Sequence, residues 1–323
     1  MNFTYKQIWL INFPVMMSLL MEQLINLTDT IFLGHVGEVE LGASALAGMY
    51  YIAIYMLGFG FSLGLQVMIA RRNGEGNLQK TGETFWQGMF FLITLSILTF
   101  TFSKLFSPTL LRTVISSDQI YLAVIQYISW RDYSFLSVFP ILAYRAFYVG
   151  TTKTRVLTIN SILLVTTNTL LNYLLIFGVG GFPRLGMAGA AIASSIAEAV
   201  ALIYLVTYTY FKVDKKKYGW RCSFNFPLLR QLFQLSSWTM IRSFFCIAPW
   251  FLFFIAIEHL GERQLAAGNV VRSVSVILFV IVNSFATTGI SLVSRSSGCR
   301  VMFWAFSASV RELVRACSPW FVV

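Results

Sequence analysis

The chain has 323 residues, of which 57% are hydrophobic and only 11% are Asp, Glu, Lys or Arg. The mean hydropathy is +0.72, and a soluble domain usually holds about 25% charged residues. These values exclude a secreted disulfide scaffold, a disordered tail and a nucleic-acid-binding domain. They predict an all-α, polytopic membrane protein.

Long apolar runs predict about eight transmembrane helices, because about 20 mostly apolar residues are needed to cross the hydrocarbon core. None of these runs alternates as a transmembrane strand would. The first run is also too long for a cleaved signal peptide. The predicted helices cover 8–33, 46–70, 85–106, 121–149, 156–178, 186–211, 231–257 and 266–293.

Lys and Arg are distributed unevenly among the loops that connect these runs. Most of them fall at the two ends of the sequence and in every second loop, and the segment 212–230 is the richest in Lys. Positively charged loops stay in the cytoplasm, so we expect a multi-pass protein of the inner (plasma) membrane with a cytoplasmic N-terminus. The net charge of +11 then reflects the cytoplasmic loops.

A short internal repeat links the two parts of the sequence. The segment that begins at His35 with His-Val-Gly-Glu recurs at His259 as His-Leu-Gly-Glu, and each copy follows a long apolar run. The first copy holds six runs, an even number, so the second copy starts on the same side of the membrane. We therefore expect a six-helix N-lobe at 1–211, a cytoplasmic linker at 212–230 and two helices of a second lobe at 231–294.

The segment 295–323 differs in character from the preceding residues. It alternates polar residues with one apolar run that is too short to cross a membrane. We interpret it as the product of a lost reading frame, which would leave a protein truncated at its C-terminus. The alternative is a genuine short cytoplasmic tail.

Acidic side chains inside the predicted helices are the first candidates for function, since ionisable groups in a bilayer are costly. Glu22, Asn26 and Asp29 share one helix face, and Glu198 lies within the sixth run. A carboxylate on an inward face can lose enough hydration to hold a proton near neutral pH. The alternative is that Asp29 lies close to the end of its helix, in water.

Polar side chains in the fifth and sixth runs supply partners for such a carboxylate. Asn168 and Asn172 are one helical turn apart, and Ser194 follows a stretch of small residues that permits close helix contact. The two amides can hold a carboxylate or a water molecule, or they can simply join neighbouring helices.

Several motifs resemble those of multidrug and toxic compound extrusion (MATE) transporters. They are Asp29-Thr-Ile-Phe-Leu-Gly, the Arg71-Arg-Asn-Gly segment, Gly150-Thr-Thr-Lys-Thr, Asn168-x-x-Leu-Asn172 and the small-residue run from Leu185 to Ser194. Their order covers residues 8 to about 293. The resemblance implies twelve helices in two six-helix lobes, cation-coupled export of organic and often cationic drugs, and no enzymatic activity.

The resemblance also implies roles for individual residues. Asp29 would be the protonatable acid of the N-lobe, with Asn168, Asn172, Ser194 and Tyr127 as its hydrogen-bonding shell. Our candidates for the substrate cavity are Glu22, Gln23, Asn26, Gln66 and Glu198. We expect no metal and no cofactor.

Two positions depart from the family pattern. The acid that the family usually carries at position 172 is Asn here. Relatives of the sodium-coupled type carry a Glu in the seventh helix, at a position near Cys246. The resemblance therefore favours protons over Na⁺ as the coupling ion.

These observations predict a proton-coupled antiporter that works by alternating access on a small organic substrate within a lipid bilayer. A full-length protein would act as a monomer, and a truly truncated one would need an oligomer to close a two-lobe cleft. Aromatic side chains are candidates to line the cavity and hold cations on their π faces, although each one on its own is expected to face lipid or pack inside: Tyr50, Tyr51, Phe59, Phe61 and Trp130.

Three alternatives remain at this stage. A lipid-linked oligosaccharide flippase of the same superfamily would need a strongly cationic cavity, but only Arg131, Arg242 and Arg272 lie in predicted helices. A membrane enzyme is disfavoured because no HExxH or GxSxG motif occurs. The third alternative is a remnant that does not transport.

Overall fold

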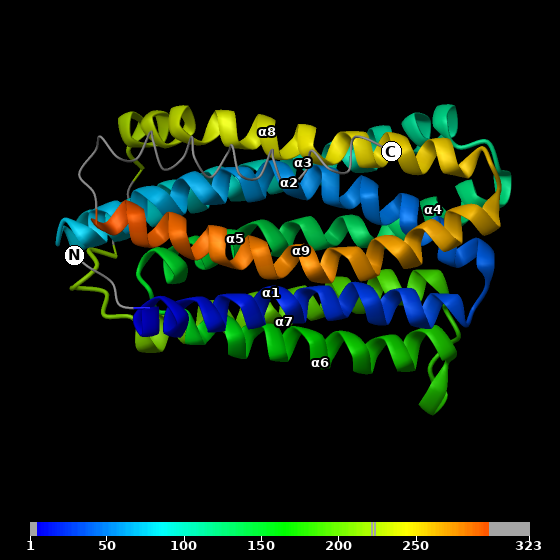
Figure 1. Ribbon diagram of the computed structural model, residues 1–323, viewed down its shortest axis with the longest axis horizontal. Helices are drawn as coiled ribbons and strands as arrows, with labels where there is room; N and C mark the ends of the chain where they lie inside the picture. The colour runs from blue at the N-terminus through cyan, green and yellow to red at the C-terminus, as the bar shows by residue number, and fades with distance from the viewer. Residues whose placement is uncertain (1–4, 221, 223, 297–323) are drawn as a thin grey trace.

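The computed structural model describes residues 5–220, 222 and 224–296 and shows a bundle of long helices (Figure 1). Helices make up all of the regular secondary structure in these residues. The predicted atypical tail lies outside them from residue 297 onward. The helices are α1 (Tyr5–Gly34), α2 (Glu38–Gly74), α3 (Leu78–Val114), α4 (Asp118–Arg131), α5 (Phe135–Gly150), α6 (Arg155–Phe177), α7 (Met187–Lys212), α8 (Phe226–Glu258) and α9 (Glu262–Ser296).

These helices match the apolar runs, and the all-helical membrane fold is confirmed. Among the described residues, α2, α3, α6, α7 and α8 are each long and apolar enough to cross a membrane. The short helices α4 and α5, of 14 and 16 residues, together occupy the fourth predicted run.

The fourth run is predicted to be one continuous helix, and its backbone stays helical throughout but tightens in the middle. A single 3-10 turn, η1 (Asp132–Ser134), separates α4 from α5. Asp132 is buried in this turn, where it accepts a 2.7 Å hydrogen bond from Ser103 Oγ and lies 3.7 Å from Lys104 Nζ of α3. A hydropathy count cannot detect such a local tightening of a helix.

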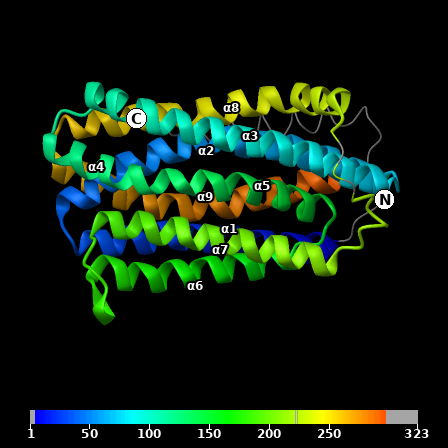
Figure 2. The same cartoon turned by 180° about the vertical axis from the view of Figure 1, so that it is seen from behind.

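Helix α2 lies in the middle of the bundle and packs against α8, α9, α5 and α4. From behind, α4 and α5 follow each other along one line, and α6 and α7 run side by side below them (Figure 2). Helix α1 packs against α6 and α9. The helices that carry the predicted site residues, α1, α6 and α7, are therefore neighbours.

Helices α2 and α8 touch almost backbone to backbone. A Cβ atom added to Gly60 would lie 2.6 Å from the Cα atom of Met240, and one added to Gly64 would lie 2.9 Å from the Cβ atom of Ser236. Only glycine leaves room for an approach this close. The two glycines thus set the distance between α2 and α8.

The internal repeat has the same geometry in both copies. Nδ1 of His35 lies 2.7 Å from the carbonyl oxygen of Ile31, and Nδ1 of His259 lies 2.9 Å from that of Ile255. Each histidine closes the end of one long helix and is followed by a tight turn into the next. The pairs α1–α2 and α8–α9 are therefore built alike.

Glu258 joins the end of α8 to the turn before α4. Its carboxylate is buried and accepts hydrogen bonds from the backbone amides of Ser116, at 3.4 Å, and Ser117, at 3.0 Å. The neighbouring His259 places Nε2 2.9 Å from Ser116 Oγ. These two amides lie immediately before α4, whose N-cap is the Ser117 side chain, so the carboxylate supports this cap from another helix.

Candidate functional site

Asp29 lies near the end of α1 and faces α6 and α7. Its Oδ1 atom accepts a 2.5 Å hydrogen bond from Nδ2 of Asn172, and Oδ2 accepts a weaker 3.4 Å bond from Oγ of Ser194. Asp29 itself is partly buried, whereas Asn172 and Ser194 are buried. The carboxylate is thus held by two helices rather than left in water.

The partners of Asp29 also bind one another. Nδ2 of Asn168 donates a 2.9 Å hydrogen bond to Ser194 Oγ, and Nδ2 of Asn172 reaches Oδ1 of Asn168 at 3.0 Å. Helices α6 and α7 approach closely at Gly189, because glycine has no Cβ atom. A Cβ atom added there would lie only 2.7 Å from the carbonyl oxygen of Leu175. The small residues at the start of α7 therefore position the site.

One atom of this cluster has no partner. Oδ1 of Asn172 is buried and accepts no hydrogen bond from the described residues. A buried amide oxygen without a hydrogen-bond donor is energetically costly, so its presence beside a carboxyl group points to a functional role for the amide. Because Nδ2 of Asn172 faces Asp29, Oδ1 would accept a proton from the carboxyl group only after the amide rotates.

Helix α4 brings a buried phenol and a charge to the same region. Tyr127 is 8% exposed and lies within electrostatic range of Asp29 and Arg131. Arg131 also acts electrostatically on Asp29. The predicted shell residue Tyr127 is therefore in the site region, and Arg131 joins it.

Arg131 forms an ion pair that the sequence analysis did not foresee. Its Nη2 atom donates a 2.8 Å hydrogen bond to Oε1 of Glu198, and its guanidinium lies 4.3 Å from the ring centre of Tyr51. Glu198 also accepts hydrogen bonds from Ser134 Oγ and, at 3.5 Å, from Tyr51 Oη. The face of Tyr51 thus holds a cation of the protein itself.

The signal for this pair was present in the sequence. Arg131 and Glu198 are opposite charges within predicted helices, and each is costly alone. Two opposite charges buried in the same bundle are expected to pair, which predicts a contact between Arg131 and Glu198. Their separation in the sequence hid the contact.

The other cavity candidates have different surroundings. Gln66 is buried, and its Nε2 donates a 3.2 Å hydrogen bond to the carbonyl oxygen of Thr287 in α9. Gln23 is partly buried on α1. Glu22 and Asn26 lie in α1, but their side chains are outside the described part. Gln66 therefore joins two helices.

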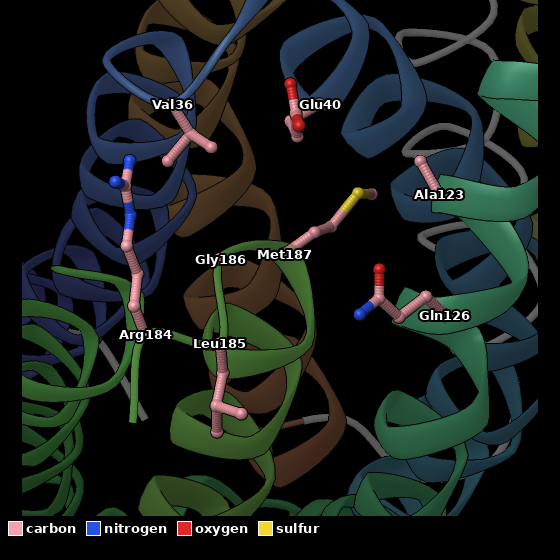
Figure 3. A pocket seen from close by; sticks show the side chains of 8 residues that line it. All are labelled: Val36, Glu40, Ala123, Gln126, Arg184, Leu185, Gly186 and Met187. Atoms are coloured by element: carbon pink, nitrogen blue, oxygen red, sulfur yellow. The ribbon is translucent and has the colours of Figure 1, made fainter. Parts of the chain in front are cut away.

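A pocket of about 390 Å³ lies at the end of the bundle where α1 ends (Figure 3). Polar side chains of Glu40, Gln126 and Arg184 line it together with Val36, Ala123, Leu185, Gly186 and Met187. Neither Asp29 nor its hydrogen-bonding partners belong to this lining. The pocket is therefore distinct from the carboxylate cluster.

No group of three or more His, Cys, Asp or Glu side chains gathers in the described residues to form a metal site. Cys246, at the position linked to the sodium-coupled subtype, is an exposed free thiol. Among the described residues, the charged side chain that acts electrostatically on Asp29 is that of Arg131, which is paired with Glu198.

Comparison with known proteins shows which family the sequence resembles. The MatE family model matches residues 14–174, which include Asp29, Asn168 and Asn172. A probable multidrug resistance protein NorM of Agrobacterium fabrum is 25% identical over 86% of this chain and 60% of its own length. One of Neisseria meningitidis serogroup A is 26% identical over 89% of this chain and 63% of its own length. The protein thus spans about 60% of the length of these relatives.

Solved structures show the same fold. An outward-facing multidrug resistance MATE family transporter of the MOP superfamily has a TM-score of 0.78 at 18% identity, covering 96% of this chain and 72% of that transporter. A MOP superfamily transporter from Pyrococcus furiosus, whose binding pocket is described as reversed in polarity, has a TM-score of 0.77 at 17% identity. That match covers 99% of this chain and 75% of the transporter.

Members of this family are transporters, and the resemblance inferred from the motifs is confirmed by the family model and by the relatives. Over residues 14–174 the protein belongs to the MatE family of multidrug and toxic compound extrusion transporters.

Proposed function

We propose that this protein takes part in exporting organic cations across the plasma membrane in exchange for protons. The observation that carries the proposal is the position of Asp29, held by Asn172 and Ser194 where α1, α6 and α7 meet. A single carboxylate can bind one proton or one organic cation, but not both. Competition for that charge is the simplest form of antiport.

The hydrogen bonds suggest how protonation would change the site. An ionised carboxylate accepts from the amide of Asn172, whereas a protonated carboxyl group must also donate. The buried Oδ1 atom of Asn172 has no donor among the described residues, so rotation of this amide would supply the acceptor. Protonation of Asp29 would then rearrange the contact between α1 and α6.

We place this rearrangement within an alternating-access cycle in which two helical lobes move about a central cavity. The N-terminus would be cytoplasmic, as the distribution of Lys and Arg indicates. Protons are favoured over Na⁺ because Cys246 carries no charge and is exposed. In a full-length protein a single polypeptide would supply both lobes.

The described charges do not favour an oligosaccharide flippase. Such a protein needs net positive charge to hold pyrophosphate. Arg131, the arginine that acts on Asp29, is neutralised by Glu198 at 2.8 Å. The region around Asp29 is thus better suited to a cation than to an anion.

The direct test measures proton release on drug binding. The protein of 323 residues is purified in detergent with a pH indicator and little buffer, and tetraphenylphosphonium is added. We expect protons to be released as the cation binds, and Asp29→Asn to abolish the release. Glu75→Gln is the matched control, since Glu75 is half exposed and pairs only locally with Arg71.

Transport is tested in vesicles that contain the same protein. An inward proton gradient should drive release of a trapped organic cation from the vesicles. This release should be absent in vesicles that contain Asp29→Asn. Equal loss without the gradient, or loss driven by a Na⁺ gradient alone, would contradict proton coupling. Proton release by Asp29→Asn equal to that of the unmodified protein would overturn the assignment of the site.

A further inference from the structure

A buried ion pair lies beside the proposed proton site and has no role in the exchange described so far. Arg131 of α4 and Glu198 of α7 are 2.8 Å apart, and each side chain is 12% exposed. Tyr51 of α2 lies over the guanidinium on one side, at 4.3 Å from its ring centre. Pairs of this kind are expensive to bury, so they often serve purposes other than stability.

Arg131 has two carboxylates within electrostatic range. It is bound to Glu198 and also acts on Asp29, which belongs to a different helix. Its Nη1 atom is buried and donates no hydrogen bond to any described residue. A guanidinium presents five N–H groups in a planar fork, so one edge can hold Glu198 while the other stays available.

Among the side chains that the structure describes, few other ionisable groups face this cluster. Tyr51 comes from α2, Tyr127 and Arg131 from α4, Glu198 from α7 and Asp29 from α1. Helix α6 contributes the uncharged amides of Asn168 and Asn172. In α9, which also packs against α1, Arg272 faces Asn269 and Phe254 instead. The balance between Arg131 and Glu198 therefore sets the local charge.

We propose that Arg131 is a positioning residue shared between two carboxylates, and that Glu198 controls how strongly its charge acts on Asp29. The pair would set the pH at which Asp29 gains and loses its proton. This inference rests on the proposed function only in taking Asp29 as the proton site. Neither Arg131 nor Glu198 exchanges a proton itself.

Removal of either charge then has opposite effects. Glu198→Gln leaves the positive charge of Arg131 uncompensated, which favours ionised Asp29 and moves its titration to lower pH. Arg131→Gln removes that charge and leaves Glu198 negative, which favours protonated Asp29 and moves the titration to higher pH. A role limited to holding helices together would not produce shifts of opposite sign.

The experiment titrates Asp29 without any drug. The infrared carbonyl stretch of the protonated carboxyl group is followed against pH, and the same spectrum of each variant with Asp29→Asn added is subtracted. We expect shifts of about one pH unit in the two directions, since a charge that acts on a carboxyl group moves its titration by this order. Arg131→Lys keeps the charge and should stay close to the unmodified protein.

The double variant Arg131→Gln, Glu198→Gln guards against loss of folding in either single variant. It removes both charges together, and its titration should return toward that of the unmodified protein. Identical titrations in all variants, or shifts in the same direction, would overturn the proposal and leave proton–drug exchange at Asp29 intact. Shifts as expected without drug-induced proton release would instead contradict the proposed function alone.

Discussion

Asn172 on α6 donates a 2.5 Å hydrogen bond from its side-chain amide to Oδ1 of Asp29 on α1. The two residues are far apart in the sequence, so this bond is a tertiary contact that depends on the packing of α1 against α6. Any change in the protonation of Asp29 therefore acts directly on the contact between these two helices.

The substitution Asn172→Asp would place a second carboxyl group beside Asp29. Two carboxylates at one site cannot both ionise easily, so one of them should keep its proton to a higher pH. We expect the infrared titration of the pair to extend upward by about one pH unit or more. Asn77→Asp is the matched control, because Asn77 caps α3 at a different place and Asp caps equally well. An unchanged titration in Asn172→Asp would show that residue 172 does not contact Asp29.

Removing the two hydrogen-bond donors of Asp29 one at a time should show which hydrogen bond stabilises the ionised carboxylate more. Asn172→Ala loses the 2.5 Å bond and Ser194→Ala loses the 3.4 Å bond. Each loss destabilises the ionised carboxylate, so the titration of Asp29 should move to higher pH in both variants. Because hydrogen bonds to charged groups are worth about 1.5–3 kcal/mol when well formed, the larger shift belongs to Asn172→Ala. A larger shift in Ser194→Ala would contradict this order.

Glu258→Gln should weaken the connection between α8 and the start of α4. The variant replaces a charged acceptor of two backbone amides by a neutral one, and caps of this kind are worth about 1 kcal/mol. We expect a lower midpoint of thermal unfolding and faster hydrogen exchange at the amides of Ser116 and Ser117. Glu75→Gln, at a half-exposed position, should leave both measurements unchanged. Slow exchange retained in Glu258→Gln would mean that the carboxylate does not support the cap.

Gly60→Ala tests the close contact between α2 and α8. The added methyl group would meet the backbone at Met240 and Thr239, which cannot move aside, so overpacking of about 1–3 kcal/mol is expected. Gly48→Ala is the matched control on the same helix, because a Cβ there has nothing within 4 Å. Thermal unfolding in detergent should show a loss of stability for Gly60→Ala and none for Gly48→Ala. Equal stability of the two variants would contradict the close approach.

Much of the fold could be predicted from hydropathy alone, because long apolar runs in a bilayer have no alternative to helices. The 3-10 turn at 132–134, in which Asp132 contacts Ser103 and Lys104, could not, because hydropathy does not register a local tightening of a helix. The cluster around Asp29 was expected from motifs. Its link to Arg131 was not, because the pairing of Arg131 with Glu198 is a property of packing between α4 and α7.

The internal repeat makes the contact between α1 and α9 equivalent to the contact between α8 and α2, but the two contacts use different residues. In the repeat, Asn12 of α1 stands where Ser236 stands in α8, and Thr288 of α9 stands where Gly64 stands in α2. The first version is a bare steric contact of Gly64 on Ser236, whereas the second is a 3.0 Å hydrogen bond from Thr288 Oγ1 to Asn12 Oδ1. The two equivalent contacts between helices have therefore diverged in chemistry, since one is a close steric approach and the other is a hydrogen bond between side chains.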